Sequence, residues 1–303
     1  MRISHISDTA RWMAYARSIE MERPDAIVRD PFSRRLAGAA GEAIARGIGD
    51  AEVIASGIAV RTAVLDEMIL ERISQDDVDL VLNLAAGLDA RPWRLALPRD
   101  LIWVDVDLPT ILEYKAGVIG TERPNCKYET LHADITEASE RARVVAYGDR
   151  AHRIMVITEG LLVYLTSKQV AALARDLYKS SSILWWLTDL SSPRSLAMLK
   201  HVMEPVLGGV TFQFAPADSV QFFRELGWRE QQFRSMLAES RRVGRDSRGS
   251  WLTRLWFFFS TPSVREEFRR LSGVALLARD RVPAPDASSL SAGPLPSAET
   301  ADL

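Results

Sequence analysis

Apolar residues recur along the chain with two different periods, and the period changes near residue 75. Before that point, stretches such as TARWMAYARSIE repeat apolar side chains at helical spacing. The pattern predicts a helix there, a short helix that starts near Pro31 and ends at Gly38, and a longer amphipathic helix over 53–73. We therefore expect residues 1–75 to be helical.

After residue 75, short apolar runs alternate with stretches at helical spacing. The runs that predict strands are 79–85, 101–106, 127–132, 153–158, 182–188, 228–236 and 273–279. Most gaps between them are long enough for crossover helices, which indicates an α/β fold with a parallel sheet covered on both faces. A helix is predicted to end at Gly227, and the apolar residues of 251–259 keep helical spacing.

Composition narrows the function classes. The chain has 303 residues and a net charge of −2, so nothing favours binding to nucleic acid or to an anionic membrane. One cysteine, Cys126, leaves no disulfide framework and no cysteine metal cluster, and we predict no metal site. No leader-like apolar core and no membrane-length apolar run is present, so we expect a cytoplasmic protein. Residues 281–303 are rich in Pro, Ala and Ser, and we expect a disordered tail.

The segment DLVLNLAAGLDARPWR, residues 79–94, predicts a strand followed by a loop that opens a helix. A dinucleotide-binding loop carries three glycines, whereas this loop has only Gly87. Asp89 follows soon after it and would repel a phosphate. The loop is therefore better suited to a nucleoside ligand that has no phosphates.

Acidic residues end the next strands. Asp107 lies twenty positions after Gly87, where a carboxylate can accept hydrogen bonds from ribose hydroxyls; the alternative is a solvated strand end. Asp134 can accept from an adenine amino group beside the backbone of Ile135, or it can cap a helix. Glu159 ends a central strand, where ligands bind in open α/β sheets, and otherwise it is a charged loop residue.

A ribose, an adenine and no phosphate point to S-adenosylmethionine. Its α-carboxylate would need an arginine, and the candidates are Arg17 and Arg61, each on an otherwise apolar helix. The alternative for both is a surface arginine with a buried stem.

Seven stretches in this order resemble the leucine carboxyl methyltransferase family of class I S-adenosylmethionine-dependent methyltransferases, over roughly residues 10–280. They are YARSIEMERPDAIVRDPFSRRLAG, AVRTAVLDEMI, VLNLAAGLDARPWRL, WVDVDLPTILEYK, HADI, VITEGLLVYL and ELGW. The bacterial branch of that family, with its tetracenomycin-type polyketide O-methyltransferases, is the most similar. Ala90 and Asp105 depart mildly from the family pattern, which often has Thr and Glu there.

The resemblance implies a doubly wound, seven-stranded, mostly parallel sheet of order 3-2-1-4-5-7-6 with strand 7 antiparallel. It also implies an N-terminal helical cap over 1–75, a methyltransferase domain over 76–280 and a substrate wall at about 190–225. Its contacts with S-adenosylmethionine would fall on the residues already singled out: Arg17, Arg61, Gly87, Asp107, Asp134, Ile135 and Glu159.

The methyl acceptor is the open question. A small-molecule carboxylate would need no base because it is ionised at neutral pH, whereas a phenol would benefit from one. Tyr164 and Asp189 follow strands at the ligand edge and His201 could reach a pocket, although structural or surface roles are the alternatives. The absence of an obvious base favours a carboxyl acceptor.

Other functions compete with small-molecule O-methylation. A methyltransferase for a protein C-terminal carboxylate would need an open groove, and an NAD-dependent oxidoreductase would lack two of its glycines. A regulatory protein that merely retains the pocket is the non-enzymatic alternative. The oligomeric state is left open.

Overall fold

The structure is a computed structural model that describes residues 6–48, 51–203, 206, 208–245 and 260–279. The expected helix at 251–259 and the expected disordered tail at 281–303 lie outside the described residues. None of the described helices is long and apolar enough to cross a membrane.

Seven strands form one sheet in the order β3-β2-β1-β4-β5-β7-β6, as the resemblance implied. The strands are β1 Leu80–Leu84, β2 Ile102–Asp107, β3 Lys127–His132, β4 Ile154–Thr158, β5 Ile183–Ser191, β6 Trp228–Ser235 and β7 Ser272–Arg279. Strands β1 to β5 pair in parallel, while β7 runs antiparallel to both β5 and β6. The order reverses beside β1, and open α/β sheets bind ligands at such a switch point.

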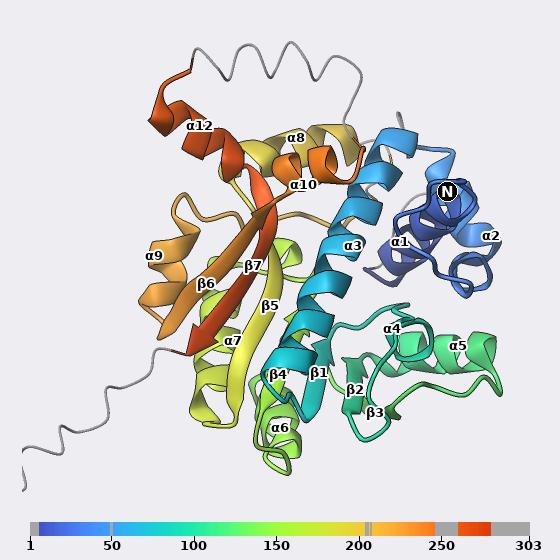
Figure 1. The fold of residues 1–303 in the computed structure, drawn as a ribbon, viewed down its shortest axis with the longest axis vertical. Helices are drawn as coiled ribbons and strands as arrows, with labels where there is room; N and C mark the ends of the chain where they lie inside the picture. Colours follow the sequence, from blue (N-terminus) through green and yellow to red (C-terminus); the bar gives the residue numbers. More distant parts are fainter. Residues whose placement is uncertain (1–5, 49–50, 204–205, 207, 246–259, 280–303) are drawn as a thin grey trace, which may run out of the picture.

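Helices cover both faces of the sheet (Figure 1). They are α1 Ile6–Met21, α2 Ser33–Ala45, α3 Ala51–Gln75, α4 Arg91–Arg94, α5 Pro109–Ile119, α6 Ala138–Gly148, α7 Ser167–Lys179, α8 Pro193–Met203, α9 Ser219–Arg224, α10 Met236–Arg242 and α12 Pro262–Arg269, with a 3-10 turn η1 at Leu162–Tyr164.

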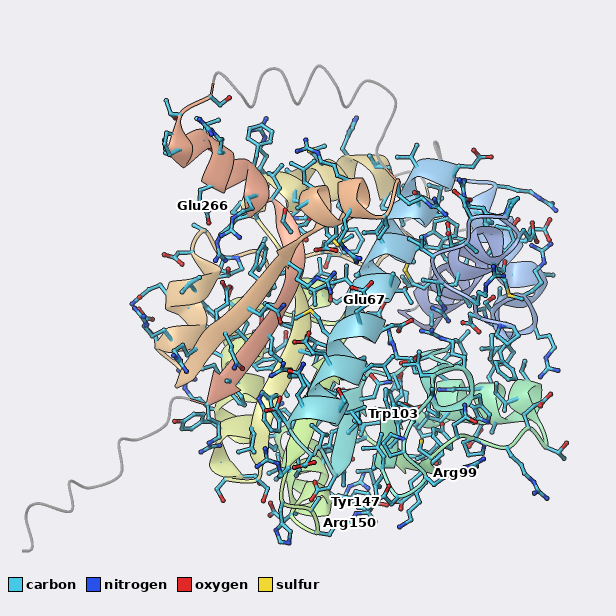
Figure 2. All side chains as sticks on the ribbon, viewed as in Figure 1. Glu67, Arg99, Trp103, Tyr147, Arg150 and Glu266 are labelled. Atoms are coloured by element: carbon cyan, nitrogen blue, oxygen red, sulfur yellow. The ribbon has the colours of Figure 1, made fainter. Side chains whose placement is uncertain are left out.

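Alternation along the central strands sends neighbouring residues into two separate cores. Ile154 and Val156 of β4 pack with α6 and α7 on one face, whereas Met155 and Ile157 pack with α3 on the other. Trp103 is fully buried beside α3, while Arg99, Arg150 and other charged side chains lie at the periphery (Figure 2). The strands are apolar on both sides because both sides are covered.

The N-terminal helices form a cap beside the carboxyl ends of the strands. α1 packs closely against α2 and α3, and Trp12 of α1 shares an apolar cluster with Met203 and Phe212 of the segment after β5. This segment therefore belongs partly to the core of the cap. The prediction that a helix ends at Gly38 is only partly right: Gly38 has φ +56° and kinks the helix, but helical backbone resumes beyond it to the end of α2.

Candidate functional site

A cavity of about 490 Å³ opens where the cap meets the carboxyl ends of β1 to β5. This volume lies in the usual range for small-molecule sites. The predicted cofactor residues all line it, as do two of the three catalytic candidates. Those lining residues are Arg17, Arg61, Gly87, Asp107, Asp134, Ile135, Glu159, Tyr164 and Asp189.

The loop after β1 is shaped by its glycine. Gly87 has φ +53°, a left-handed conformation that side chains other than glycine adopt at a cost. A Cβ at this position would lie 3.3 Å from the Cβ of Ala10 on α1, so the loop passes close under the cap. The Gly87 amide donates to Asp107 Oδ2 at 2.7 Å, which ties the ends of β1 and β2 together.

Two aspartates of β2 differ in depth. Asp105 is fully buried and accepts hydrogen bonds from Lys115, Tyr128, Asn83 and Trp103, so it is a structural centre. Asp107, at the end of the strand, lines the cavity. The pKa of Asp107 is raised, because burial outweighs the hydrogen bonds that its carboxylate accepts from the amides of Gly87 and Leu108, which lower it.

The end of β3 supplies the third wall. Asp134 accepts from both the amide and the hydroxyl of Thr136 through Oδ1, at 2.9 and 2.7 Å. This turn replaces the predicted alternative of a helix cap, because α6 starts at Ala138 with Glu137 preceding it. Ile135 is buried, and its carbonyl accepts from Arg141.

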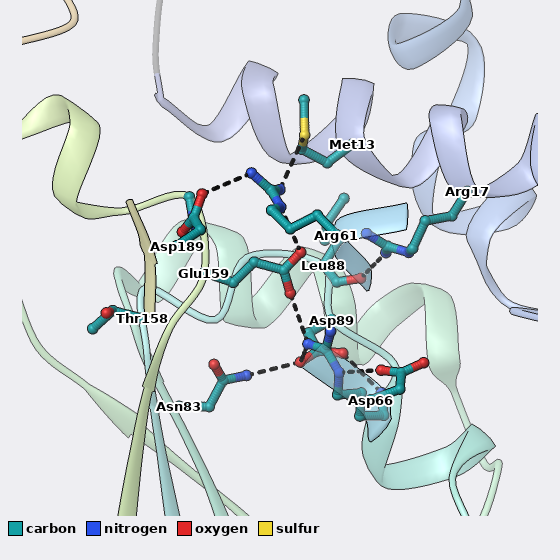
Figure 3. A network of polar contacts seen from close by, with 12 residues as sticks. Met13, Arg17, Arg61, Asp66, Asn83, Leu88, Asp89, Thr158, Glu159 and Asp189 are labelled. Carbon is teal, nitrogen blue, oxygen red and sulfur yellow. Dashed lines mark hydrogen bonds and ion pairs between the residues drawn. The ribbon is translucent and has the colours of Figure 1, made fainter. Parts of the chain in front are cut away.

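A chain of ion pairs crosses the bottom of the cavity (Figure 3). Arg61 of α3 donates from Nε to Glu159 Oε1 at 3.2 Å and from Nη1 to Asp189 Oδ2 at 3.0 Å. Its Nη2 lies 3.7 Å from the sulfur of Met13, a weak acceptor. Burial raises the pKa of Glu159, but Arg91 and Arg61 outweigh it, so the pKa is lowered and the carboxylate is charged at neutral pH.

Arg91 extends this chain and was missed in the sequence. It donates from Nη1 to both Glu159 and Asp89, at 2.8 Å each, and from Nε to Asp66 at 2.6 Å. Its Nη2 is buried and has no hydrogen-bond partner among the residues that the structure describes. Sequence spacing could not find these pairs, because Asp66 and Glu159 lie 25 and 68 positions away.

The expectation for Asp89 needs a correction. It is held by Arg91 and by the side-chain amide of Asn83, and Arg91 and Lys115 lower its pKa against the effect of burial. Its charge is therefore compensated within the protein. The repulsion of a phosphate by Asp89 is weaker than the sequence suggested.

Arg17 joins the cap to the loop. Its Nε donates to the buried Asp30 at 2.8 Å, and its Nη2 donates to the carbonyl of Leu88 at 2.7 Å. The alternative of a surface arginine is wrong, since the residue is 8% exposed. One of its nitrogens therefore holds the glycine loop in place, and another is engaged by Asp30 within the cap.

The structure places two of the three catalytic candidates at the cavity and the third away from it. Tyr164 and Asp189 line the cavity, and burial raises the pKa of Tyr164. His201 lies on α8 with an exposed side chain and is not among the cavity-lining residues. The prediction that it reaches the pocket is not met, because α8 turns Leu199 and Met203 toward the cavity instead.

The cavity also has an apolar side that the sequence only partly indicated. Trp12, Met13 and Ile58 of the cap face Met203 and Phe212 across it. Tyr164 stacks obliquely on Phe212, with ring centres 5.3 Å apart. The segment at 190–225 thus contributes to both the cavity wall and the core of the cap, which were expected as alternatives.

Comparisons with known sequences agree with this geometry. The leucine carboxyl methyltransferase profile matches residues 10–178. A relative from Streptomyces coelicolor, named as an inferred S-adenosyl-L-methionine-dependent methyltransferase, is 35% identical over 184 residues, 57% of this chain and 65% of the relative. One with the same kind of name from Mycobacteroides abscessus is 31% identical over 65% of this chain and 64% of its own length. In both, less than two thirds of the relative is matched.

Solved structures share the fold at low identity. A DUF574 family protein from Streptomyces avermitilis superimposes with a TM-score of 0.58 and 11% identity, over 90% of this chain and 97% of its own. A protein from Thermobifida fusca whose structure is titled as that of an inferred methyltransferase gives 0.54 and 14%, over 88% and 94%. These likenesses concern the fold alone.

Proposed function

The chain belongs to the leucine carboxyl methyltransferase family, and from this premise we propose that it is an S-adenosylmethionine-dependent O-methyltransferase for a small apolar molecule. The observation that carries the proposal is the single cavity that brings Gly87, Asp107 and Asp134 together with Arg61. The names of its relatives point the same way.

The donors and acceptors present fit this cofactor. Asp107 would accept from the ribose hydroxyls, and Asp134 with the backbone of Ile135 would meet the adenine edge. Arg61 would hold the α-carboxylate through its two Nη atoms, and Glu159 would lie near the amino group. The buried, unpartnered Nη2 of Arg91 is a further donor at the cavity.

When bound, S-adenosylmethionine supplies a methyl group already activated on a sulfonium. The protein is then needed mainly to orient the acceptor and to keep water out. We expect the cap to do both, because α1 passes close over the loop of Gly87 and α3 lines the cavity, while Met203 and Phe212 form the opposite wall. A catalytic metal has no part in this proposal.

The shape of the cavity favours a small molecule over a protein C-terminus. A protein tail would need an open groove to lie in, whereas here the cap helices and the segment after β5 share one apolar cluster around the cavity. Its apolar lining suits a hydrophobic small-molecule acceptor, such as a polyketide or another secondary metabolite.

Calorimetry tests the cofactor and labelled transfer tests the reaction. We expect S-adenosylmethionine and S-adenosylhomocysteine to bind in the micromolar range or tighter and NAD not to bind. Methyl-labelled cofactor should then deliver label to apolar hydroxyl or carboxyl compounds as an alkali-stable ether or an alkali-labile ester. Binding of NAD in place of the adenosyl compounds would remove the proposal, and labelling of peptide C-termini alone would replace the acceptor class.

A further inference from the structure

The ion pair between Arg61 and Asp189 raises a problem for the proposed cofactor site. Arg61 would have to bind an incoming carboxylate, yet two carboxylates already hold it. Guanidinium groups bind carboxylates best through two parallel N–H donors. The occupied atoms of Arg61 therefore decide which existing partner must leave.

The two Nη atoms are the edge that a new carboxylate can use. Nη1 is held by Asp189, whereas Nε holds Glu159. Among the described residues, the hydrogen-bond partner of Nη2 is the weakly accepting sulfur of Met13. A carboxylate that bridges Nη1 and Nη2 displaces Asp189 and leaves the bond to Glu159 in place. Glu159 is anchored further by Arg91, whose side chain is 1% exposed.

Asp189 has no second cation among the contacts that the described residues make with it. Its Oδ1 accepts from the amide of Gly160 at 2.7 Å, so this second bond holds the residue on β5 when the contact with Arg61 Nη1 is lost. Its side chain is 21% exposed, and it lines the cavity together with Tyr164 and Phe212. The released oxygen is then an uncompensated acceptor beside the apolar wall.

We propose that Arg61 exchanges Asp189 for the cofactor carboxylate, and that the released Asp189 accepts the proton of a hydroxyl group on the methyl acceptor. This inference rests on the proposed function, because it needs a cofactor with an α-carboxylate. It makes the acceptor an alcohol or a phenol, where the sequence had favoured a carboxylate.

The step balances within the groups named. The acceptor O–H bond breaks as its proton passes to Asp189 Oδ2, and the oxygen forms a bond to the methyl carbon. The C–S bond breaks with its electron pair going to sulfur, which leaves neutral S-adenosylhomocysteine. Asp189 afterwards loses its proton to water.

Two cofactor forms test the exchange without any acceptor. We would measure the affinities of S-adenosylmethionine and decarboxylated S-adenosylmethionine for the wild-type protein and for Asp189→Asn. In the variant Arg61 no longer has a charged competitor at Nη1, so the ratio of the two affinities should rise about tenfold in favour of the carboxylate form, roughly the strength of one charge-assisted hydrogen bond.

The control variant is Glu137→Gln, which removes the same charge at an exposed position outside the cavity and should leave the ratio unchanged. A ratio that stays constant or falls in Asp189→Asn overturns the exchange. Failure of S-adenosylmethionine to bind the wild-type protein would instead overturn the proposed function. Circular dichroism checks that Asp189→Asn is folded.

A pair of matched aromatic probes tests the acceptor class. With S-adenosylhomocysteine bound, 2-naphthol should bind the wild-type protein better than 2-naphthoate, because Asp189 accepts from a hydroxyl and repels a carboxylate. Asp189→Asn should shift this preference toward 2-naphthoate by about tenfold. A wild-type preference for 2-naphthoate, an unchanged preference in the variant, or no binding of either probe would overturn the role of Asp189.

Discussion

Asp105 and Asp107 lie two positions apart on β2, and their surroundings give them different roles. Asp105 is enclosed by four donors and stabilises the sheet, whereas Asp107 stands at the end of the strand with the cavity in front of it. The amide of Gly87 fixes one of its oxygens. At the residue scale, depth along the strand separates a structural carboxylate from one that can meet a ligand.

Replacing Asp107 tests the ribose contact. Asp107→Ala should weaken binding of S-adenosylmethionine by about 1–3 kcal/mol, because hydroxyl groups lose a charged acceptor. Asp107→Asn keeps one acceptor oxygen and should lose less. Calorimetry measures both, and Glu137→Gln serves as the charge control. Unchanged affinity in Asp107→Ala would contradict the ribose assignment.

Replacing Arg61 tests the proposed contact between its two Nη atoms and the carboxylate of the cofactor. Arg61→Lys keeps the positive charge but cannot present two parallel donors, so affinity for S-adenosylmethionine should fall by about tenfold. Affinity for 5′-methylthioadenosine, which has no carboxylate, should change little. If both ligands lose affinity equally in calorimetry, Arg61 supports the site as a whole and does not bind the carboxylate.

The glycine loop is the element on which the site depends. Its left-handed residue and its contact with the cap arise from one position, Gly87. The loop joins β1 to α4, and Arg17 of α1 holds the carbonyl of the next residue. The cap and the sheet therefore meet at the same short turn.

Gly87→Ala should lower the free energy of unfolding by about 1–2 kcal/mol, because alanine is strained at positive φ. It should also weaken cofactor binding, since the new methyl group presses on Ala10. Gly57→Ala is the matched control: Gly57 is exposed within α3, and no atom of the described residues lies within 4 Å of its Cβ position. Alanine there should raise the free energy of unfolding by about 0.5–1 kcal/mol. Urea denaturation compares the two, and equal effects would refute the strain at Gly87.

Much of the secondary structure and the strand order was predictable from the sequence. The strands, their order and the antiparallel last strand followed from apolar runs and the family resemblance, and β3 has the predicted bounds. The resumed helix after Gly38 was not predicted, since a glycine normally marks an end. A local pattern does not contain the packing of α2 against α1 that carries the helix past the kink.

The candidate site was predictable residue by residue but not as a network. Each cofactor candidate named from the sequence lines the cavity. Arg91, however, looks like any polar residue of a short helix until the fold brings Asp66 and Glu159 to it. His201 shows the opposite failure, because the sequence could not say which side of α8 faces inward.

At the scale of the whole molecule, the cavity lies between the N-terminal cap and the sheet, and neither unit could enclose it alone. The sheet contributes a row of acidic residues at its edge, and the cap contributes arginines and an apolar cover. The ion pairs of Arg61 with Glu159 and Asp189 join the two units across this boundary, and so does the hydrogen bond from Arg17 to the carbonyl of Leu88. Stability and ligand binding should therefore share the same charges.

The contribution of Glu159 to the free energy of unfolding should depend on pH. Its pKa in the folded protein lies below the ordinary value of 4.5, so it adds stability above about pH 4.5 that is lost as the pH falls through the lowered pKa. Glu159→Gln should cost about 2 kcal/mol of unfolding free energy at pH 7. The difference between wild type and variant should shrink below pH 4.5. Urea denaturation across this range measures it, and a difference independent of pH would contradict the charge of Glu159.

A crystal structure of the complex with S-adenosylhomocysteine tests the central claim most directly. We predict the ribose hydroxyls on Asp107, the purine edge beside Asp134 and Ile135, and the carboxylate on the two Nη atoms of Arg61. An adenosyl group outside this cavity, or a carboxylate held by another cation while Arg61 keeps Asp189, would contradict the account.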